Sequence, residues 1–302
     1  MKDLSVSFCR MKFKNPVTCA SGTFGSGIEY SEFVDLDGLG AITTKGVSVD
    51  AWEGNPTPRV AETPSGMMNA IGLQNPGADV FIKRDLAFLK KHDVPVIVNV
   101  CGHSTEEYVK AVKLLSEREE IALLEINVSC PNVKEGGIAF GTDPKSLFEI
   151  TKAVKKVSKK PVIMKLSPNV TDIALMARSA EEGGADAISL INTFTAMKID
   201  IYKKSFVLAN RTGGLSGPAI HPIAVRMVYE ASKAVSIPVI GMGGIACAAD
   251  AIEMMMAGAV MVAVGMMNFH EPSLMTDIIK DIEAWMDETG TEKISDIIGC
   301  MH

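Results

Sequence analysis

The sequence predicts a single closed (β/α)8 barrel, a TIM barrel with long insertions at the carboxyl-terminal face. Short β-branched or apolar runs alternate with amphipathic stretches along all 302 residues, the pattern of parallel βαβ units. Eight such runs occur, and eight parallel strands close into a barrel, whereas a doubly wound open sheet, the alternative, usually has fewer. A chain of this length also exceeds what one core usually supports, unless the fold is an α/β barrel.

The expected elements follow one another without a repeat, a low-complexity tract or a linker, so residues 1–302 are predicted to form one domain. Strands are expected at 17–20, 41–45, 96–100, 123–127, 162–166, 187–192, 238–241 and 260–265. Helices are expected at 79–92, 105–117, 144–159, 172–182, 220–234, 248–257 and 273–287. Two intervals, 48–78 and 193–218, are too long for simple connections. Both follow the carboxyl end of a strand, and we expect them to be functional loops.

The composition is that of an ordinary soluble globular protein, with 47% apolar and 22% charged residues. A net charge of −6 argues against a nucleic-acid partner or an anionic membrane surface. No apolar run approaches the roughly 20 residues of a membrane span, and the first residues lack an apolar signal region, so a cytoplasmic protein is expected. The six cysteines include no CxxC pair, which favours reduced thiols and predicts no metal site.

Polar residues recur where the predicted strands end. Lys45, Asn99, Asn127, Lys165 and Asn192 all occupy such positions. The carboxyl ends of barrel strands share one rim, and active sites of these barrels form there. A core that only needed filling would place Val, Ile or Leu at these points, so the pattern predicts an active site.

Lys165 lies in the apolar run 162–166, which is typical of a buried strand. Its stem could simply pack while the ammonium reaches the barrel mouth. We favour a cation held for an electron-rich ligand, because an unpaired buried ammonium is costly. Lys45 has the same two interpretations, with weaker support from its flanks.

Glycines follow the last two strands. Gly243 and Gly244 precede a predicted helix, and Gly265 follows the eighth strand. Exposed backbone N–H groups and a helix N-terminus in this part of a barrel often bind phosphate, although such glycines can also be plain turns. No GxGxxG fingerprint follows a strand, so a dinucleotide bound on a Rossmann unit has no support.

Cys130 lies just after the fourth strand and opens a polar, glycine-containing segment at 132–143. A lone cysteine is commonly a small buried apolar residue. On a loop over a barrel mouth, however, a thiol can act as a base if its pKa suits the reaction.

These residues, in this order, resemble class 1 dihydroorotate dehydrogenases, and specifically the class 1B catalytic subunit. The resemblance covers nearly the whole chain. Its most specific stretches are 69–77 (NAIGLQNPG), 127–132 (NVSCPN), 165–169 (KLSPN), 212–218 (TGGLSGP) and 241–245 (GMGGI).

The resemblance implies FMN as cofactor and oxidation of dihydroorotate to orotate in pyrimidine biosynthesis. The residues that it implies for the flavin are Ser21, Lys45, Gly46, Asn99, Asn127, Lys165 and Ile191, with Gly217, Gly243, Gly244, Gly265 and Met266 at the ribityl phosphate. The residues that it implies for the substrate are Lys45, Asn69, Ala70, Ile71, Gly72, Leu73, Asn127, Asn192 and Thr193. Met266 departs from the family, whose members usually carry a small hydroxyl residue there; its backbone N–H can still reach a phosphate.

The implied chemistry accounts for the residue types. Cys130 would take a proton from the ring carbon next to the one that delivers hydride to the flavin. Lys165 would face the negative charge that develops on the reduced flavin. Asparagines suit a substrate with carbonyl, amide and carboxylate groups, because each offers a donor and an acceptor.

Electrons must leave the flavin, yet the sequence has no cysteine cluster for an iron–sulfur centre. The class 1B resemblance implies a partner subunit with FAD and a [2Fe–2S] cluster, NAD as final acceptor, and a heterotetramer built on a homodimer core. The alternatives are a class 1A homodimer that reduces fumarate, a flavin-dependent dihydropyrimidine dehydrogenase, a phosphate-binding barrel without redox chemistry, or a non-catalytic assembly partner.

Overall fold

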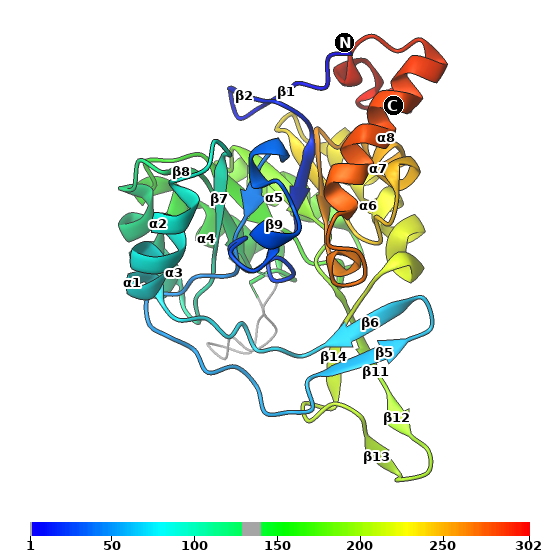
Figure 1. The fold of residues 1–302 in the computed structure, drawn as a ribbon. Helices are drawn as coiled ribbons and strands as arrows, with labels where there is room; N and C mark the ends of the chain where they lie inside the picture. Colours follow the sequence, from blue (N-terminus) through cyan, green and yellow to red (C-terminus); the bar gives the residue numbers. More distant parts are fainter. Residues whose placement is uncertain (1, 129–139) are drawn as a thin grey trace.

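Eight short parallel strands form one sheet, which the helices surround in Figure 1. The structure is a computed structural model that describes residues 2–128 and 140–302. The strands are β3 (Val17–Cys19), β4 (Ile42–Thr43), β7 (Val96–Val100), β8 (Ile121–Asn127), β9 (Val162–Lys165), β10 (Ala187–Leu190), β15 (Val239–Met242) and β16 (Met261–Val264). They pair in the order β3-β16-β15-β10-β9-β8-β7-β4. A parallel bridge between Thr18 and Ala41 joins the two ends of the sheet, so the predicted barrel is confirmed.

Helices cover the outside of the barrel, so the strands are buried on both faces and read as continuous apolar runs. The long helices are α3 (Thr105–Ser116), α4 (Pro144–Val157), α5 (Ile173–Glu182), α6 (His221–Ala234), α7 (Ala248–Met256) and α8 (Leu274–Thr289). Ser104, Asp143 and Asp172 begin α3, α4 and α5, because each side chain accepts a hydrogen bond from a backbone N–H of the first turn. Gly290, with φ of +71°, ends α8.

One predicted helix is not a regular α-helix along its whole length. The segment expected to be a regular helix at 79–92 consists of α1 (Ala78–Val80), a π-helical stretch (Phe81–Leu86) and α2 (Ala87–Leu89). Phe81, Asp85 and Leu86 of the π-helical stretch are buried, as is Leu89 in α2. Short 3₁₀ turns occur at Tyr30–Glu32, Leu36–Gly38, Pro218–Ile220, Met266–Phe269 and Ile294–Ile297.

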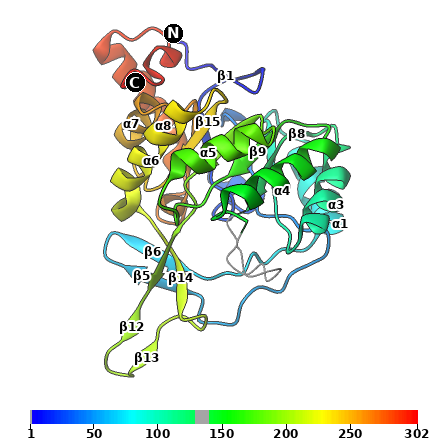
Figure 2. The same ribbon diagram turned by 180° about the vertical axis from the view of Figure 1, so that it is seen from behind.

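The prediction that residues 48–78 and 193–218 are loops is wrong in one respect, because both intervals contain strands and these strands pair with each other. The strands are β5 (Val60–Thr63), β6 (Gly66–Asn69), β11 (Phe194–Met197) and β14 (Thr212–Ser216), in an antiparallel sheet of order β11-β14-β6-β5. This sheet lies beyond one end of the barrel (Figures 1 and 2). Buried Ala61, Met68 and Leu208 give it a small core of its own. The hairpin of β12 (Ile199–Asp200) and β13 (Ser205–Phe206) projects further outward.

Local sequence conceals β14 because two glycines, poor strand formers, lie at its centre. Contacts with distant residues require them. A Cβ on Gly213 would lie 2.8 Å from the backbone oxygen of Asn69, and one on Gly214 would collide with the side chain of Thr193. The glycines therefore allow two segments about 145 positions apart in the chain to approach closely.

The opposite end of the barrel carries both chain termini and a hairpin of β1 (Val6–Phe8) and β2 (Met11–Phe13) (Figure 1). This hairpin was also absent from the expected strands. Buried Val6, Phe8 and Phe13 pack into the main core, so the hairpin belongs to the barrel end on which it lies.

Candidate functional site

A cavity of about 780 Å³ opens between the carboxyl end of the barrel and the antiparallel sheet. Residues on or just after all eight barrel strands line it, and its outer wall consists of Met67, residues 69–73, residues 212–214, Ser216 and Gly217. A volume in this range suits a cofactor together with a small substrate. The predicted polar rim is thus brought together around one space.

Every described residue that the sequence assigned to the site lines this cavity. They are Ser21, Lys45, Gly46, Asn69, Ala70, Ile71, Gly72, Leu73, Asn99, Asn127, Lys165, Ile191, Asn192, Thr193, Gly217, Gly243, Gly244, Gly265 and Met266. Cys130 lies outside the described residues. Val128 and Gly141, on either side of that gap in the description, both line the cavity.

Lys165 forms the charged floor of the cavity. Its side chain is 4% exposed, its Nζ donates a hydrogen bond to Ser21 Oγ at 3.0 Å, and Glu125 Oε2 lies 3.6 Å away. Glu125 in turn accepts hydrogen bonds from Asn99 and Ser189. Sequence reasoning missed Glu125, although the signal was the one that identified Lys165: a charged residue inside an apolar strand.

Asparagines form the polar wall. Asn192 Nδ2 donates to Asn127 Oδ1 at 3.2 Å, and the Tyr108 hydroxyl donates to the backbone oxygen of Asn127 at 2.7 Å, which holds the end of β8. Asn169, to which the sequence gave no role, also lines the cavity; its side chain donates to the backbone oxygen of Thr193 and accepts from the N–H of Thr195. The sequence signal was present in the motif at 165–169.

Lys45 is the second cation at the cavity. Burial lowers the pKa of its ammonium below the usual value; nearby Cys101 opposes this shift, and Arg59 adds to it. Because an adjacent anion favours the charged form of a lysine, a carboxylate placed here would restore that pKa. The position therefore suits an anionic ligand.

Three segments that contain glycine line one side of the cavity, at Gly217, at Gly243 and Gly244, and at Gly265. Gly217, Gly243 and Gly244 have φ values of +107°, +132° and +71°, which side chains rarely adopt. A Cβ on Gly243 would lie 2.6 Å from Ala224 Cβ, and one on Gly244 would lie 2.7 Å from His221 Cβ. These glycines allow the turn to pack against the start of α6 while it lines the cavity.

His221 and Met266 complete this side. His221 Nδ1 lies 2.9 Å from the Gly243 carbonyl oxygen and its Nε2 lies 3.1 Å from Glu253 Oε2, so the ring holds the turn in place. The Met266 side chain covers Gly217, since a Cβ there would lie 2.5 Å from Met266 Cε. Met266, where the resemblance implies a small hydroxyl residue, thus packs directly over Gly217.

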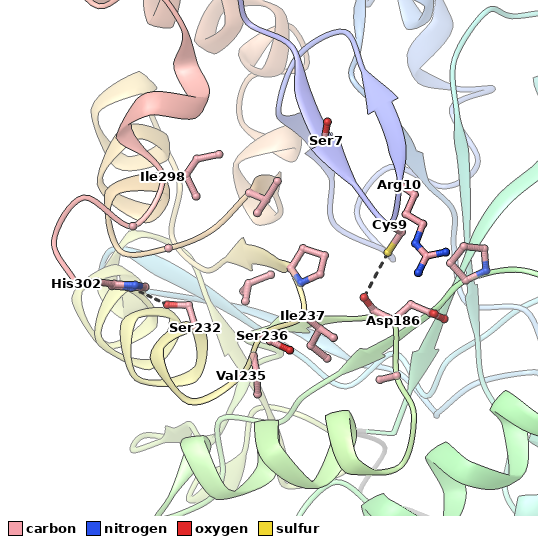
Figure 3. Close-up of a pocket in the computed structure, with 17 residues that line it drawn as sticks. Ser7, Cys9, Arg10, Asp186, Ser232, Val235, Ser236, Ile237, Ile298 and His302 are labelled. Atoms are coloured by element: carbon pink, nitrogen blue, oxygen red, sulfur yellow. Dashed lines mark hydrogen bonds between the residues drawn. The ribbon is translucent and has the colours of Figure 1, made fainter.

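A second cavity, of about 900 Å³, lies at the opposite end of the barrel (Figure 3). Two pairs of its polar residues are hydrogen-bonded to each other: the Cys9 thiol donates to the Asp186 carbonyl, and Ser232 bonds His302. Burial raises the pKa of the Cys9 thiol to about 12, so the thiol stays protonated at neutral pH. Catalytic residues of such barrels lie at the carboxyl end, and the first cavity is therefore the candidate active site.

The described residues contain neither a metal-binding cluster nor a membrane-spanning helix. Within 2–128 and 140–302, no three His, Cys, Asp or Glu side chains gather where they could hold a metal ion. Among the helices of the same ranges, none is long and apolar enough to cross a membrane.

Comparison with known proteins agrees with this geometry. Residues 3–286 match the family model described as dihydroorotate dehydrogenase. The catalytic subunit of dihydroorotate dehydrogenase B (NAD(+)) from Lachnoclostridium phytofermentans is 62% identical over 297 residues, which cover 98% of this chain and 99% of the relative. The subunit of the same name from Alkaliphilus oremlandii is 54% identical, with 99% and 98% covered.

A solved structure shares the fold. The Eimeria tenella dihydroorotate dehydrogenase in complex with ferulenol superposes with a TM-score of 0.81 at 21% identity, covering 98% of this chain and 88% of that one. Barrel architecture, family model and full-length relatives agree, and the chain belongs to the dihydroorotate dehydrogenase family.

Proposed function

We propose that this chain oxidises (S)-dihydroorotate to orotate in pyrimidine biosynthesis, with FMN bound at the carboxyl end of the barrel and Cys130 as general base. The cavity at the carboxyl end of the barrel is the observation on which this proposal rests. Within about 780 Å³ it is lined by the ammonium of Lys165, by asparagine side chains and, on one side, by glycines. The family and the full-length relatives support the reaction.

The residues present fit FMN on three counts. Asn99 Oδ1 is buried and has no hydrogen-bond partner among the described residues, so it can accept a hydrogen bond from an N–H group of the flavin ring. Lys165 supplies a cation at the floor. Gly217, Gly243, Gly244 and Gly265, which have no side chains of their own, line one side of the cavity and would bind the phosphate together with the backbone N–H of Met266. Ser21, Gly46, Asn127 and Ile191 would contact the remainder of the cofactor.

The substrate would lie between the asparagine wall and the outer wall of the cavity. Lys45 offers an ammonium for the carboxylate, and Asn69, Asn127 and Asn192 offer amide donors and acceptors. Ala70 to Leu73 and Thr193 close the space around it. When bound, FMN supplies the acceptor for the hydride that leaves the substrate ring. Cys130 removes the proton from the neighbouring ring carbon.

Anaerobic absorbance spectroscopy tests this function. The purified chain should be yellow, and dihydroorotate should bleach its flavin absorbance while dihydrouracil should not. A colourless protein that binds no added FMN would contradict the proposal and favour a barrel without redox chemistry. Bleaching by dihydrouracil instead would move the chain to the dihydropyrimidine dehydrogenases.

The path of the electrons is the second part of the proposal. We infer a partner subunit that carries FAD and a [2Fe–2S] cluster and passes electrons to NAD. The names of the relatives, catalytic subunits of an NAD(+) enzyme, support this path. The projecting hairpin exposes Ile199, Ile201, Tyr202 and Phe206, and an exposed apolar patch of this kind supports assembly. Two such chains as a core and two partners would form a heterotetramer.

Reconstitution checks this path. Alone, the chain should reduce its FMN with dihydroorotate but show no dihydroorotate-driven NAD reduction, because on this proposal electrons reach NAD only through the FAD and the [2Fe–2S] cluster of the partner subunit. Addition of the partner subunit should start NAD reduction, followed at the absorbance of NADH. Steady turnover of the isolated chain with fumarate as sole acceptor would place it in class 1A.

A further inference from the structure

A carboxylate is buried in the barrel interior beside the cavity. Glu125, in the middle of β8, is 1% exposed. Its Oε2 accepts a hydrogen bond from Asn99 Nδ2 at 2.6 Å and lies 3.6 Å from Lys165 Nζ, while its Oε1 accepts from Ser189 Oγ at 2.7 Å. These partners lie on β7, β9 and β10, so one side chain is tied to three other strands.

The stability of the fold does not explain why a carboxylate is buried at position 125. The desolvation of two charges offsets much of their attraction, and apolar side chains of similar volume would often stabilise a core as well or better. Glu125 does not itself line the cavity, whereas Lys165 and Asn99 do. Any effect of the carboxylate on a ligand must therefore pass through these two neighbours or through its charge.

Glu125 decides which way the Asn99 amide points. A carboxylate only accepts hydrogen bonds, so Asn99 must turn its NH₂ group toward Glu125. Its Oδ1 then remains as a buried acceptor without a partner among the described residues. A glutamine at position 125 would offer both a donor and an acceptor and would remove this constraint.

We propose that Glu125 is a positioning residue that orients Lys165 and Asn99 toward the flavin and offsets the charge of Lys165, which lowers the midpoint potential of bound FMN. The inference rests on the proposed function, since it needs FMN in the cavity. Charges beside a flavin tune its potential: a cation favours the reduced form, and an anion favours the oxidised form. Glu125 and Lys165 together present nearly no net charge.

The test measures the midpoint potential of bound FMN and its dissociation constant in the parent protein and in variants. Glu125→Gln removes the negative charge with almost no change of volume and should shift the potential upward. Ser189→Ala is the matched control, because it removes a hydrogen bond to the same carboxylate and leaves the charge. Its potential should stay close to that of the parent.

A double variant covers the case in which Glu125→Gln alone fails to fold. Lys165→Met should shift the potential downward, and Lys165→Met with Glu125→Gln, which keeps the core neutral, should return it toward the parent value. A potential equal to the parent's in FMN-loaded Glu125→Gln, or a double variant equal to Lys165→Met, overturns the inference while the proposed function stands. A parent protein that binds no FMN overturns both.

Discussion

Cys130→Ala should keep its flavin and reduce it with dihydroorotate about 10²–10⁴-fold more slowly than the parent, which is the usual contribution of a positioned base. The residues that we expect to hold FMN are elsewhere in the chain, so cofactor binding should survive. Val128 and Gly141, which are described on either side of residues 129–139, both line the cavity. Anaerobic stopped-flow absorbance measures the rate.

The pH dependence of the rate of flavin reduction is a second test of Cys130 as the base. Only a thiolate can take the proton, so reduction of the parent should accelerate as rising pH deprotonates the thiol. Cys130→Ala should lose this acceleration. Cys247→Ala, which removes an exposed thiol outside the cavity lining, is the control and should reduce its flavin at the parent rate. A parent rate in Cys130→Ala would show that another group is the base.

Lys165→Met should bind FMN about 10- to 100-fold more weakly, because a hydrogen bond to a charged group contributes about 1.5–3 kcal/mol. The flavin that remains should have a lower reduction potential, since the cation that favours the reduced form is gone. Methionine preserves the apolar stem within β9, so the change isolates the charge. Lys165→Ala, which also empties the space of the stem, should lose FMN during purification.

Stability should change as well. Lys165→Met leaves the Glu125 carboxylate buried without its cation, and breaking a buried pair in this way costs about 3–5 kcal/mol of unfolding free energy. Addition of Glu125→Gln should recover much of this loss in chemical denaturation. If Lys165→Met retains FMN with unchanged affinity and potential, the lysine serves packing and its proposed role is wrong.

Much of the fold and site could be predicted from local sequence. Strands that are buried on both faces must be apolar throughout, so β7, β9 and β10 were identifiable as short runs. Lys165 and Asn127 interrupted such runs where strands end, and this marked the rim of the cavity. The base role of Cys130 stays a prediction, since that residue lies outside the described part of the chain.

Other features depended on tertiary structure alone. Pairing of β6 with β14 joins segments about 145 positions apart, and the glycines that allow it look like loop residues because their partners are invisible in sequence. Glu125 shows the same limit. The sequence shows that residue 125 is charged. The ion pair with Lys165 and the hydrogen bond from Asn99 form only because the closed barrel brings side chains of neighbouring strands together in its interior. Hydrophobic pattern records whether a residue is buried; only the fold decides which residue it meets.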